Sequence, residues 1–174
     1  MLETIREFAL EQLAAAGEED TARRAHAEHF VMLLEAGQGR FGDEPWMNPM
    51  RISATDRHNV TAVLEWANRN EDAAGHALRL LTRLPDFYDS VGHLNEALLV
   101  APAALRRIAP RVTPAYADAI QSIGHIYNTL NDDAQALVWL QQAQDLWRQI
   151  DAPRKLVRAL ERAQRSARNI GDLD

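Results

Sequence analysis

The chain has 174 residues, of which 47% are hydrophobic, so it can bury a core, and a single domain is the default. Its net charge of −6 argues against non-specific nucleic-acid binding. It has no cysteine, which excludes disulfides and cysteine-based metal or redox sites and fits a cytosolic setting. No apolar run approaches the roughly 20 residues of a membrane span, and the N-terminus lacks the order of a signal peptide.

Two helices are predicted within residues 1–36. Apolar residues recur at helical spacing from Leu2 to Ala16, and Gly17 follows as a stop signal. A second helix is predicted from Asp20 to Ala36 on the same grounds. Residues 37–55 include "GQGRFGDEPWMNPM", with three glycines and two prolines, and are predicted to be a long loop.

The segment 56–174 is predicted to be helix after helix, because apolar stripes at helical spacing alternate with prolines and turn residues. Thr113 followed by Pro114 is typical of an N-cap with proline in the first helical turn. Asp151 with Pro153 is a weaker form of the same signal. No segment has the pattern of a strand, so the predicted fold class is all-α.

Two parts of this segment correspond at a constant offset of 40 residues. "AIQSIGHIYNTLNDDAQAL" begins at Ala119, and "ALERAQRSARNIGDLD" begins at Ala159. The turn Asn131-Asp132 then matches Gly171-Asp172. A fixed period of this size is the signature of a helical solenoid.

Within one period the residues resemble the tetratricopeptide repeat, whose pattern combines large apolar, small and aromatic positions. The matching residues are Ile120, Ile123, Gly124, Tyr127, Ala136, Leu140 and Ala143. A glycine inside a helix costs about 1 kcal/mol relative to alanine. The resemblance implies that Gly124 marks the closest approach of two helices in an antiparallel hairpin, and that the hairpins form a right-handed solenoid.

Other units fit this pattern less well. Pro85 occupies the position of Gly124 in an earlier unit, so a helix is predicted to start or kink there. Gln164 occupies it in the last unit, which stops after its first helix. Because an orphan helix cannot bury its apolar stripe alone, the natural chain is predicted to continue beyond Asp174.

Several motifs in the chain do not meet the requirements of the chemical sites that they resemble. "GQGRFG" at 37–42 matches a dinucleotide-binding fingerprint, but a helix rather than a strand precedes it. His26 and His29 share a helix face but lack a third metal ligand nearby. No Ser/His/Asp group or carboxylate pair can be argued from spacing. We therefore expect no catalytic residue, no cofactor and no metal, and we expect that the chain is not an enzyme.

The basic stretch at 154–168 has three interpretations. This stretch contains six basic residues and one acidic residue, Glu161. They can form a solvated helix face, a groove for an acidic or phosphorylated partner, or a DNA contact. The overall negative charge argues against DNA, and the first two interpretations stay open.

Three phrases resemble one bacterial family: "LETIREFALEQL", "RRAHAEHFVMLLEAG" and "DRHNVTAVLEWANRNEDAAGHALRLL". They look like the region that follows the ATPase core in large transcriptional regulators of the LuxR and AfsR type, which are STAND ATPases. The resemblance covers nearly the whole chain. It implies that 1–36 are helices following a missing winged helix, that 37–55 is a loop, and that 56–174 are tetratricopeptide-like repeats of which the last is truncated.

This resemblance implies a non-catalytic, cytoplasmic region that senses a signal and restrains the ATPase until that signal binds. The implied partners are a protein, peptide or small inducer in the repeat groove, and the ATPase and DNA-binding domains of the same protein; membrane and direct nucleic-acid contacts are not expected. Positions matching the groove of a tetratricopeptide array are Asp118, Gln121, His125, Asn128, Thr129, Arg158, Glu161, Arg165, Arg168 and Asn169. The alternative function is a stand-alone tetratricopeptide scaffold for an unrelated assembly.

Overall fold

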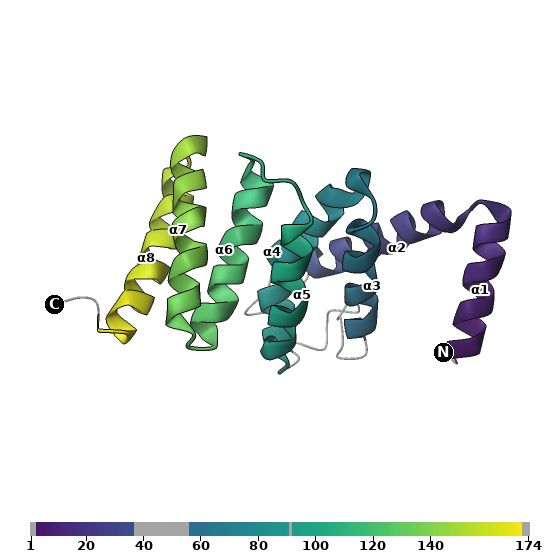
Figure 1. Ribbon diagram of the computed structural model, residues 1–174, viewed down its shortest axis with the longest axis horizontal. Helices are drawn as coiled ribbons and strands as arrows, with labels where there is room; N and C mark the ends of the chain where they lie inside the picture. The colour runs from purple at the N-terminus through teal and green to yellow at the C-terminus, as the bar shows by residue number, and fades with distance from the viewer. Residues whose placement is uncertain (1–2, 37–55, 91, 172–174) are drawn as a thin grey trace.

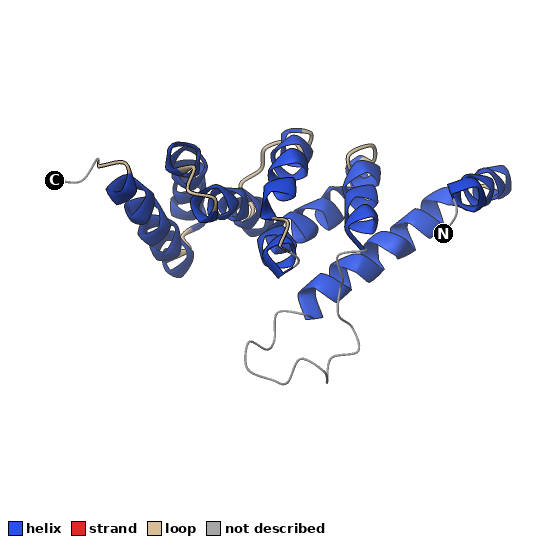
Figure 2. Cartoon of the chain, turned by 90° about the horizontal axis from the view of Figure 1, so that it is seen from below, coloured by secondary structure: helices blue, strands red, loops and turns tan. Residues whose placement is uncertain are grey.

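The computed structural model describes residues 3–36, 56–90 and 92–171, and every regular element in these ranges is a helix (Figures 1 and 2). The described part of the chain is therefore all-α, as its composition and periodicity predict. The elements are α1 (Glu3–Ala16), α2 (Glu19–Ala36), α3 (Arg57–Ala67), the short 3-10 helix η4 (Glu71–Ala73), α4 (Ala74–Ser90), α5 (Leu94–Arg106), α6 (Pro114–Thr129), α7 (Asp133–Ile150) and α8 (Pro153–Asn169). The loop predicted at 37–55, with its "GQGRFG" motif, lies outside the described residues.

The helices pack against their neighbours along the chain and also against helices two places away. α6 packs on α7 and α7 on α8, while α4 contacts both α2 and α6, and α6 contacts α8. α2, α4, α6 and α8 therefore lie side by side, with α3, α5 and α7 packed between successive members (Figure 1). One cluster of buried apolar side chains extends from Ala27 on α2 to Ala159 on α8.

Three of the predicted helix signals can be compared with the structure. Gly17 has a φ of +70° and directly follows α1, so the predicted stop is confirmed. Thr113 caps α6, because its side chain accepts a hydrogen bond from the backbone N–H of Tyr116 at 3.4 Å. Asp151 is not an N-cap: it ends α7 in the left-handed conformation with a φ of 58°, and Ala152 precedes α8. The two-residue turn requires a left-handed residue, which aspartate tolerates.

A helix start or a kink is predicted at Pro85; Pro85 lies inside α4, so the predicted start is wrong, and the kink stays a prediction. The helix begins at Ala74 and continues through the proline to Ser90. A proline in a helix interior costs about 3 kcal/mol. Its neighbours Leu84 and Tyr88 are fully buried, and each such side chain contributes about 1.5–3 kcal/mol on burial. Packing around the proline therefore outweighs the local preference to break the helix.

Gly124 lies where α6 and α7 approach each other closely, as the repeat pattern predicts. A Cβ atom at this position would lie 2.9 Å from Cγ and 3.3 Å from the backbone nitrogen of Leu140. Real Cβ atoms almost never approach a neighbour as closely as the first of these distances. The glycine therefore allows α7 to pack closely against α6, and this contact offsets its poor helix propensity.

Candidate partner-binding face

Three neighbouring helices carry a continuous set of polar side chains, which we call the α4–α6–α8 face. Its members are Thr82, Asp86 and Asp89 on α4, Ser122, His125 and Thr129 on α6, and Arg158, Arg162 and Arg165 on α8. The helices are joined across it by short polar contacts, such as the Ser122 hydroxyl that donates to the backbone carbonyl of Thr82 at 3.2 Å. The face therefore belongs to the packed array rather than to one helix.

His125 occupies the middle of the α4–α6–α8 face. Its ring nitrogen Nδ1 lies 3.3 Å from the Thr129 hydroxyl, which donates to the His125 carbonyl at 3.0 Å. Burial and the positive charge of Arg162 lower the pKa of the imidazole to about 4, although nearby carboxylates on α4 oppose this effect. At neutral pH the ring is therefore uncharged and can both donate and accept a hydrogen bond.

Arg162 is the most buried of the three arginines on this face. Burial lowers the pKa of its guanidinium and the charge of Arg158 acts in the same direction, while Asp86 on α4 opposes them. An arginine nevertheless stays protonated in proteins. The α8 side of the face is thus positive and partly desolvated, whereas the α4 side carries the carboxylates of Asp86 and Asp89.

Neither Arg162 nor the α4 carboxylates were among the predicted groove residues. Thr82, Ser122 and Arg162 are spaced at intervals of 40 residues. Because the predicted groove residues include neither Thr82 nor Ser122, this offset alone does not lead from them to Arg162. The charges of Asp86 and Asp89 reach the site only because α4 packs directly against α6.

Gln121 and Asn128 require correction, because the structure buries both of them. Gln121 is 9% exposed and accepts a hydrogen bond from the Trp147 indole nitrogen at 2.7 Å. Asn128 is 2% exposed and donates to the Ser166 hydroxyl at 2.7 Å. The helical spacing places them beside the polar stripe of α6, but α7 and α8 cover those sides. Their side chains join helices and are not available to a partner.

Asp118 is also used between helices. Its Oδ1 lies 2.6 Å from Nζ of Lys155, and this ammonium group lies 5.6 Å from the ring centroid of Trp147. The carboxylate therefore connects α6 to α8 at one end of the face. Of the five residues predicted on α6, His125 and Thr129 lie on the face. The hydrogen bonds that the structure shows for their side chains stay within α6.

The five residues predicted on α8 are all exposed, but they do not share one side of the helix. Ser166 marks the side that faces α6, because its hydroxyl binds Asn128. Glu161 and Arg168 lie about 150° round the helix from Ser166 and so point away from α6. Asn169 lies about 60° from Ser166, on the same side as Arg162. Arg158 and Arg165 lie between these extremes. The charge of Arg158 lowers the pKa of Arg162, and the charge of Arg165 lowers the pKa of His125.

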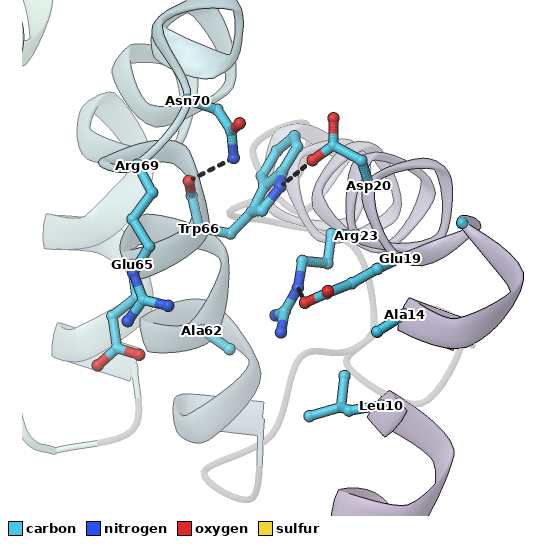
Figure 3. Close-up of a pocket in the computed structure, with 11 residues that line it drawn as sticks. Leu10, Ala14, Glu19, Asp20, Arg23, Ala62, Glu65, Trp66, Arg69 and Asn70 are labelled. Carbon is cyan, nitrogen blue, oxygen red and sulfur yellow. Dashed lines mark hydrogen bonds and ion pairs between the residues drawn. The ribbon is translucent and has the colours of Figure 1, made fainter. Parts of the chain in front are cut away.

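A hollow lies between α1, α2 and α3, away from the α4–α6–α8 face, with a volume of about 560 Å³ (Figure 3). Several polar groups in its walls are already paired: the Trp66 indole donates to Asp20 at 3.0 Å, and Arg23 donates to Glu19 at 2.8 Å. The Asn70 amide donates to the Trp66 carbonyl at 3.2 Å. The first contact joins α3 to α2, whereas the other two connect residues four apart in the chain. Because these polar groups already bind one another, the hollow is a weaker candidate than the α4–α6–α8 face.

Across residues 3–36, 56–90 and 92–171, no three His, Asp or Glu side chains gather closely enough to hold a metal ion. None of the helices in these ranges combines the length and apolar character that crossing a bilayer requires. Comparisons of the chain with protein-family models, curated proteins and solved structures find no match. A function is therefore inferred from the α4–α6–α8 face itself.

The lowered pKa of His125 predicts a specific dependence of stability on pH. Below the ordinary histidine pKa of 6.5 the unfolded chain binds a proton that the folded chain does not bind until about pH 4. Stability is therefore lost as the pH falls through this window. The slope of unfolding free energy against pH reports how many more protons the unfolded chain binds than the folded chain. Between pH 6.5 and 4 we expect His125→Gln to reduce this difference by nearly one proton.

Urea denaturation at a series of pH values measures this slope. His58→Gln, at an exposed position on α3, is the matched control and should leave the slope unchanged. Equal slopes for the wild type and His125→Gln would contradict the prediction.

Proposed function

We propose that this chain is a non-catalytic helical-repeat region, a right-handed tetratricopeptide-like solenoid of antiparallel helix hairpins, that binds a protein or peptide partner. The observation that carries the proposal is the α4–α6–α8 face, on which a partly buried arginine lies beside an uncharged histidine at the junction of three packed helices. Helical-repeat proteins use such continuous faces, built from successive repeats, as binding surfaces.

The spacing of contacts and turns supports the repeat. The hydrogen bond between Ser122 and Thr82 joins residues 40 positions apart, which is the offset found in the sequence. Asn131 and Gly171, also 40 positions apart, have φ values of 60° and 76° and end α6 and α8 in the same way. Equivalent positions in successive units thus adopt equivalent conformations, as a solenoid requires.

The charges on the face support an acidic partner. Arg158, Arg162 and Arg165 form its α8 side, and arginine is well suited to recognising carboxylates because its planar fork donates two parallel hydrogen bonds. The neutral ring of His125 adds a donor and an acceptor beside them. A peptide with carboxylates near α8 and an amide or cationic group near Asp86 and Asp89 matches this arrangement.

The resemblance to LuxR- and AfsR-type regulators extends the proposal to the whole protein. We propose that partner or inducer binding to this region relieves the restraint on a STAND ATPase in a cytoplasmic transcriptional regulator. Sequencing the gene on both sides tests this step. A reading frame that encodes a P-loop upstream and a helix-turn-helix downstream supports it. A frame with neither contradicts it and leaves the stand-alone scaffold.

Peptide binding can be tested by fluorescence anisotropy with a labelled peptide rich in Glu and Leu. We expect it to bind, and we expect its counterpart with Gln in place of Glu to bind at least about tenfold more weakly. The double variant Arg158→Ala/Arg162→Ala should weaken binding by a similar factor, because both changes remove charge from the face.

Arg106→Ala/Arg107→Ala is the matched control, since it removes two exposed positive charges from the end of α5. This variant should bind the peptide as the wild type does. Equal weakening by both double variants would indicate a non-specific charge effect and contradict binding at the α4–α6–α8 face.

A further inference from the structure

Helix α5 is apolar on nearly all of its sides. Its sequence, LNEALLVAPAALR, contains ten apolar residues among 13. Ala97, Ala101 and Leu105 lie on one side of the helix and are buried in the core. Leu99 lies on the opposite side and is 77% exposed, which is the highest value for a large apolar side chain in the described residues. Because a helix that is apolar all round is normally covered on every side, the exposed side of α5 indicates a partner.

Leu99 is the centre of an apolar patch, which we call the α5 patch. It consists of the exposed Leu99 and Ala103, one turn apart, and the half-buried Leu98 and Val100 on either side of Leu99. Helix α7 also exposes an apolar side chain, Val138, but glutamines lie one turn before and after it, at 135, 141 and 142. A single exposed apolar residue of that kind is ordinary on a protein surface. The α5 patch differs because the turn that follows Leu99 is apolar as well.

The α5 patch lies on a part of the array that the proposed function leaves open. Helices α3, α5 and α7 form one layer, and α2, α4, α6 and α8 form the other (Figures 1 and 2). A preceding domain and further repeats would join the array at its two ends, away from the middle of the α3–α5–α7 layer. The α4–α6–α8 face belongs to the other layer, so a peptide bound there would not cover α5.

Two copies of α5 fit each other when they run antiparallel. Because Leu99 and Ala103 are equally far from position 101, a two-fold axis at that level brings the large side chain of one copy against the small one of the other. The same arrangement brings Glu96, at the start of one helix, near the exposed Arg106 and Arg107 at the end of the other. We propose that the chain forms an antiparallel, two-fold dimer through the α5 patch.

The charged groups around the patch favour the antiparallel direction. A parallel pair would place Glu96 beside Glu96 and arginine beside arginine, and like charges repel. Glu96 already accepts a hydrogen bond from Arg57 at 2.6 Å and lies 3.1 Å from Nδ1 of His93. Its side chain is nevertheless 42% exposed, so it can also contact an arginine of the second copy. Asn95, exposed on the same side of α5, is uncharged and opposes neither direction.

The symmetry of the contact limits its growth to two copies. A two-fold contact uses the same patch on both copies, so no patch is left free in the dimer. One helix against another buries less than the roughly 800 Å² per partner of a standard interface, so we expect a weak dimer. The average mass should therefore rise with protein concentration from 19.6 kDa to no more than twice this value.

Sedimentation equilibrium over a range of concentrations tests the association. Leu99→Gln should weaken it at least about tenfold and should keep the wild-type circular dichroism spectrum, because the side chain is exposed. Val138→Gln, at the exposed position on α7, is the matched control and should associate as the wild type does. A wild type that is monomeric at every concentration would overturn the proposal, as would species larger than a dimer or equal weakening by Val138→Gln.

The dimer and the peptide site can fail separately. Arg106→Ala/Arg107→Ala should weaken association, because it removes the positive charges near Glu96 of the second copy, and it should leave peptide binding unchanged. Leu99→Gln should likewise bind the acidic peptide as the wild type does. Loss of peptide binding together with association in Leu99→Gln would overturn the assignment of the two contacts to different layers.

Cysteine cross-linking tests the antiparallel register, because the chain has no cysteine of its own. In the proposed dimer residue 99 of one copy faces residue 103 of the other, whereas identical residues are offset by four positions, or about 6 Å along the helices. A disulfide requires Cα atoms within about 7 Å of each other. In a mixture of Leu99→Cys and Ala103→Cys, the mixed disulfide should form at least about tenfold faster than the disulfide of either variant alone. Equal rates would overturn the proposal.

Discussion

Replacing Gly124 by valine is expected to lower the free energy of unfolding by about 3 kcal/mol, at the upper end of the range for overpacked cores. The new Cβ would lie 2.9 Å from Cγ of Leu140 and 3.3 Å from its backbone nitrogen. Rotation of the leucine side chain can relieve the first contact but not the second. Because valine has a higher helix propensity than glycine, the loss can come only from the contact between α6 and α7. Urea denaturation measures it.

Gly75→Val is the matched control, because Gly75 is also helical and a Cβ there would meet nothing within 4 Å. It should change stability by no more than about 0.5 kcal/mol. Leu140→Ala alone should cost about 2–5 kcal/mol. Combined with Gly124→Val it should cost clearly less than the sum, because the two sites are in contact. Additive effects would show that close packing at Gly124 is not the cause.

Replacing Trp147 by phenylalanine is expected to lower the free energy of unfolding by about 2–3 kcal/mol. The indole nitrogen donates to the side-chain oxygen of Gln121 at 2.7 Å, and both residues are buried. Phenylalanine leaves that oxygen without a donor and fills less space. Gln121→Leu removes the other partner and leaves the indole N–H unpaired, for a loss of about 1–3 kcal/mol. Thermal and urea denaturation of both variants measure these losses.

The double variant distinguishes a structural hydrogen bond from two unrelated effects. With both partners gone, neither leaves an unpaired polar group, so the combined loss should be at least about 1 kcal/mol smaller than the sum. Trp139→Phe, at a half-buried position on the same helix, is the control and should cost less than Trp147→Phe. A Gln121→Leu variant with wild-type stability and weakened peptide binding would instead return Gln121 to the binding face.

Features decided by local chemistry could be predicted from the sequence. The absence of strand patterns predicts the all-α class, and Gly17 and the Thr113-Pro114 pair predict helix ends that the structure confirms. The resemblance of one unit to the tetratricopeptide pattern implies that Gly124 is a position of close approach, which the distance to Leu140 confirms. Each of these depends on residues close together in the chain or on one repeated spacing.

Features decided by neighbouring helices could not be predicted in this way. Helical spacing gives the side of α6 on which Gln121 and Asn128 lie, but not that α7 and α8 cover that side. Pro85 has a local preference to break a helix, and the buried side chains around it reverse the outcome. The charge environment of His125 comes from α4 and α8, which are about 40 residues away in either direction.

The difference between the features that could be predicted and those that could not has a physical cause. Hydrophobic periodicity, caps and left-handed turns are properties of a few consecutive residues, so the order of helices is readable along the chain. Burial and pKa depend on how much water and charge surround a side chain, and distant segments supply both. Only the packing of α4, α6 and α8 therefore shows that Arg162 and His125 share one face, and that Gln121 and Asn128 serve the core.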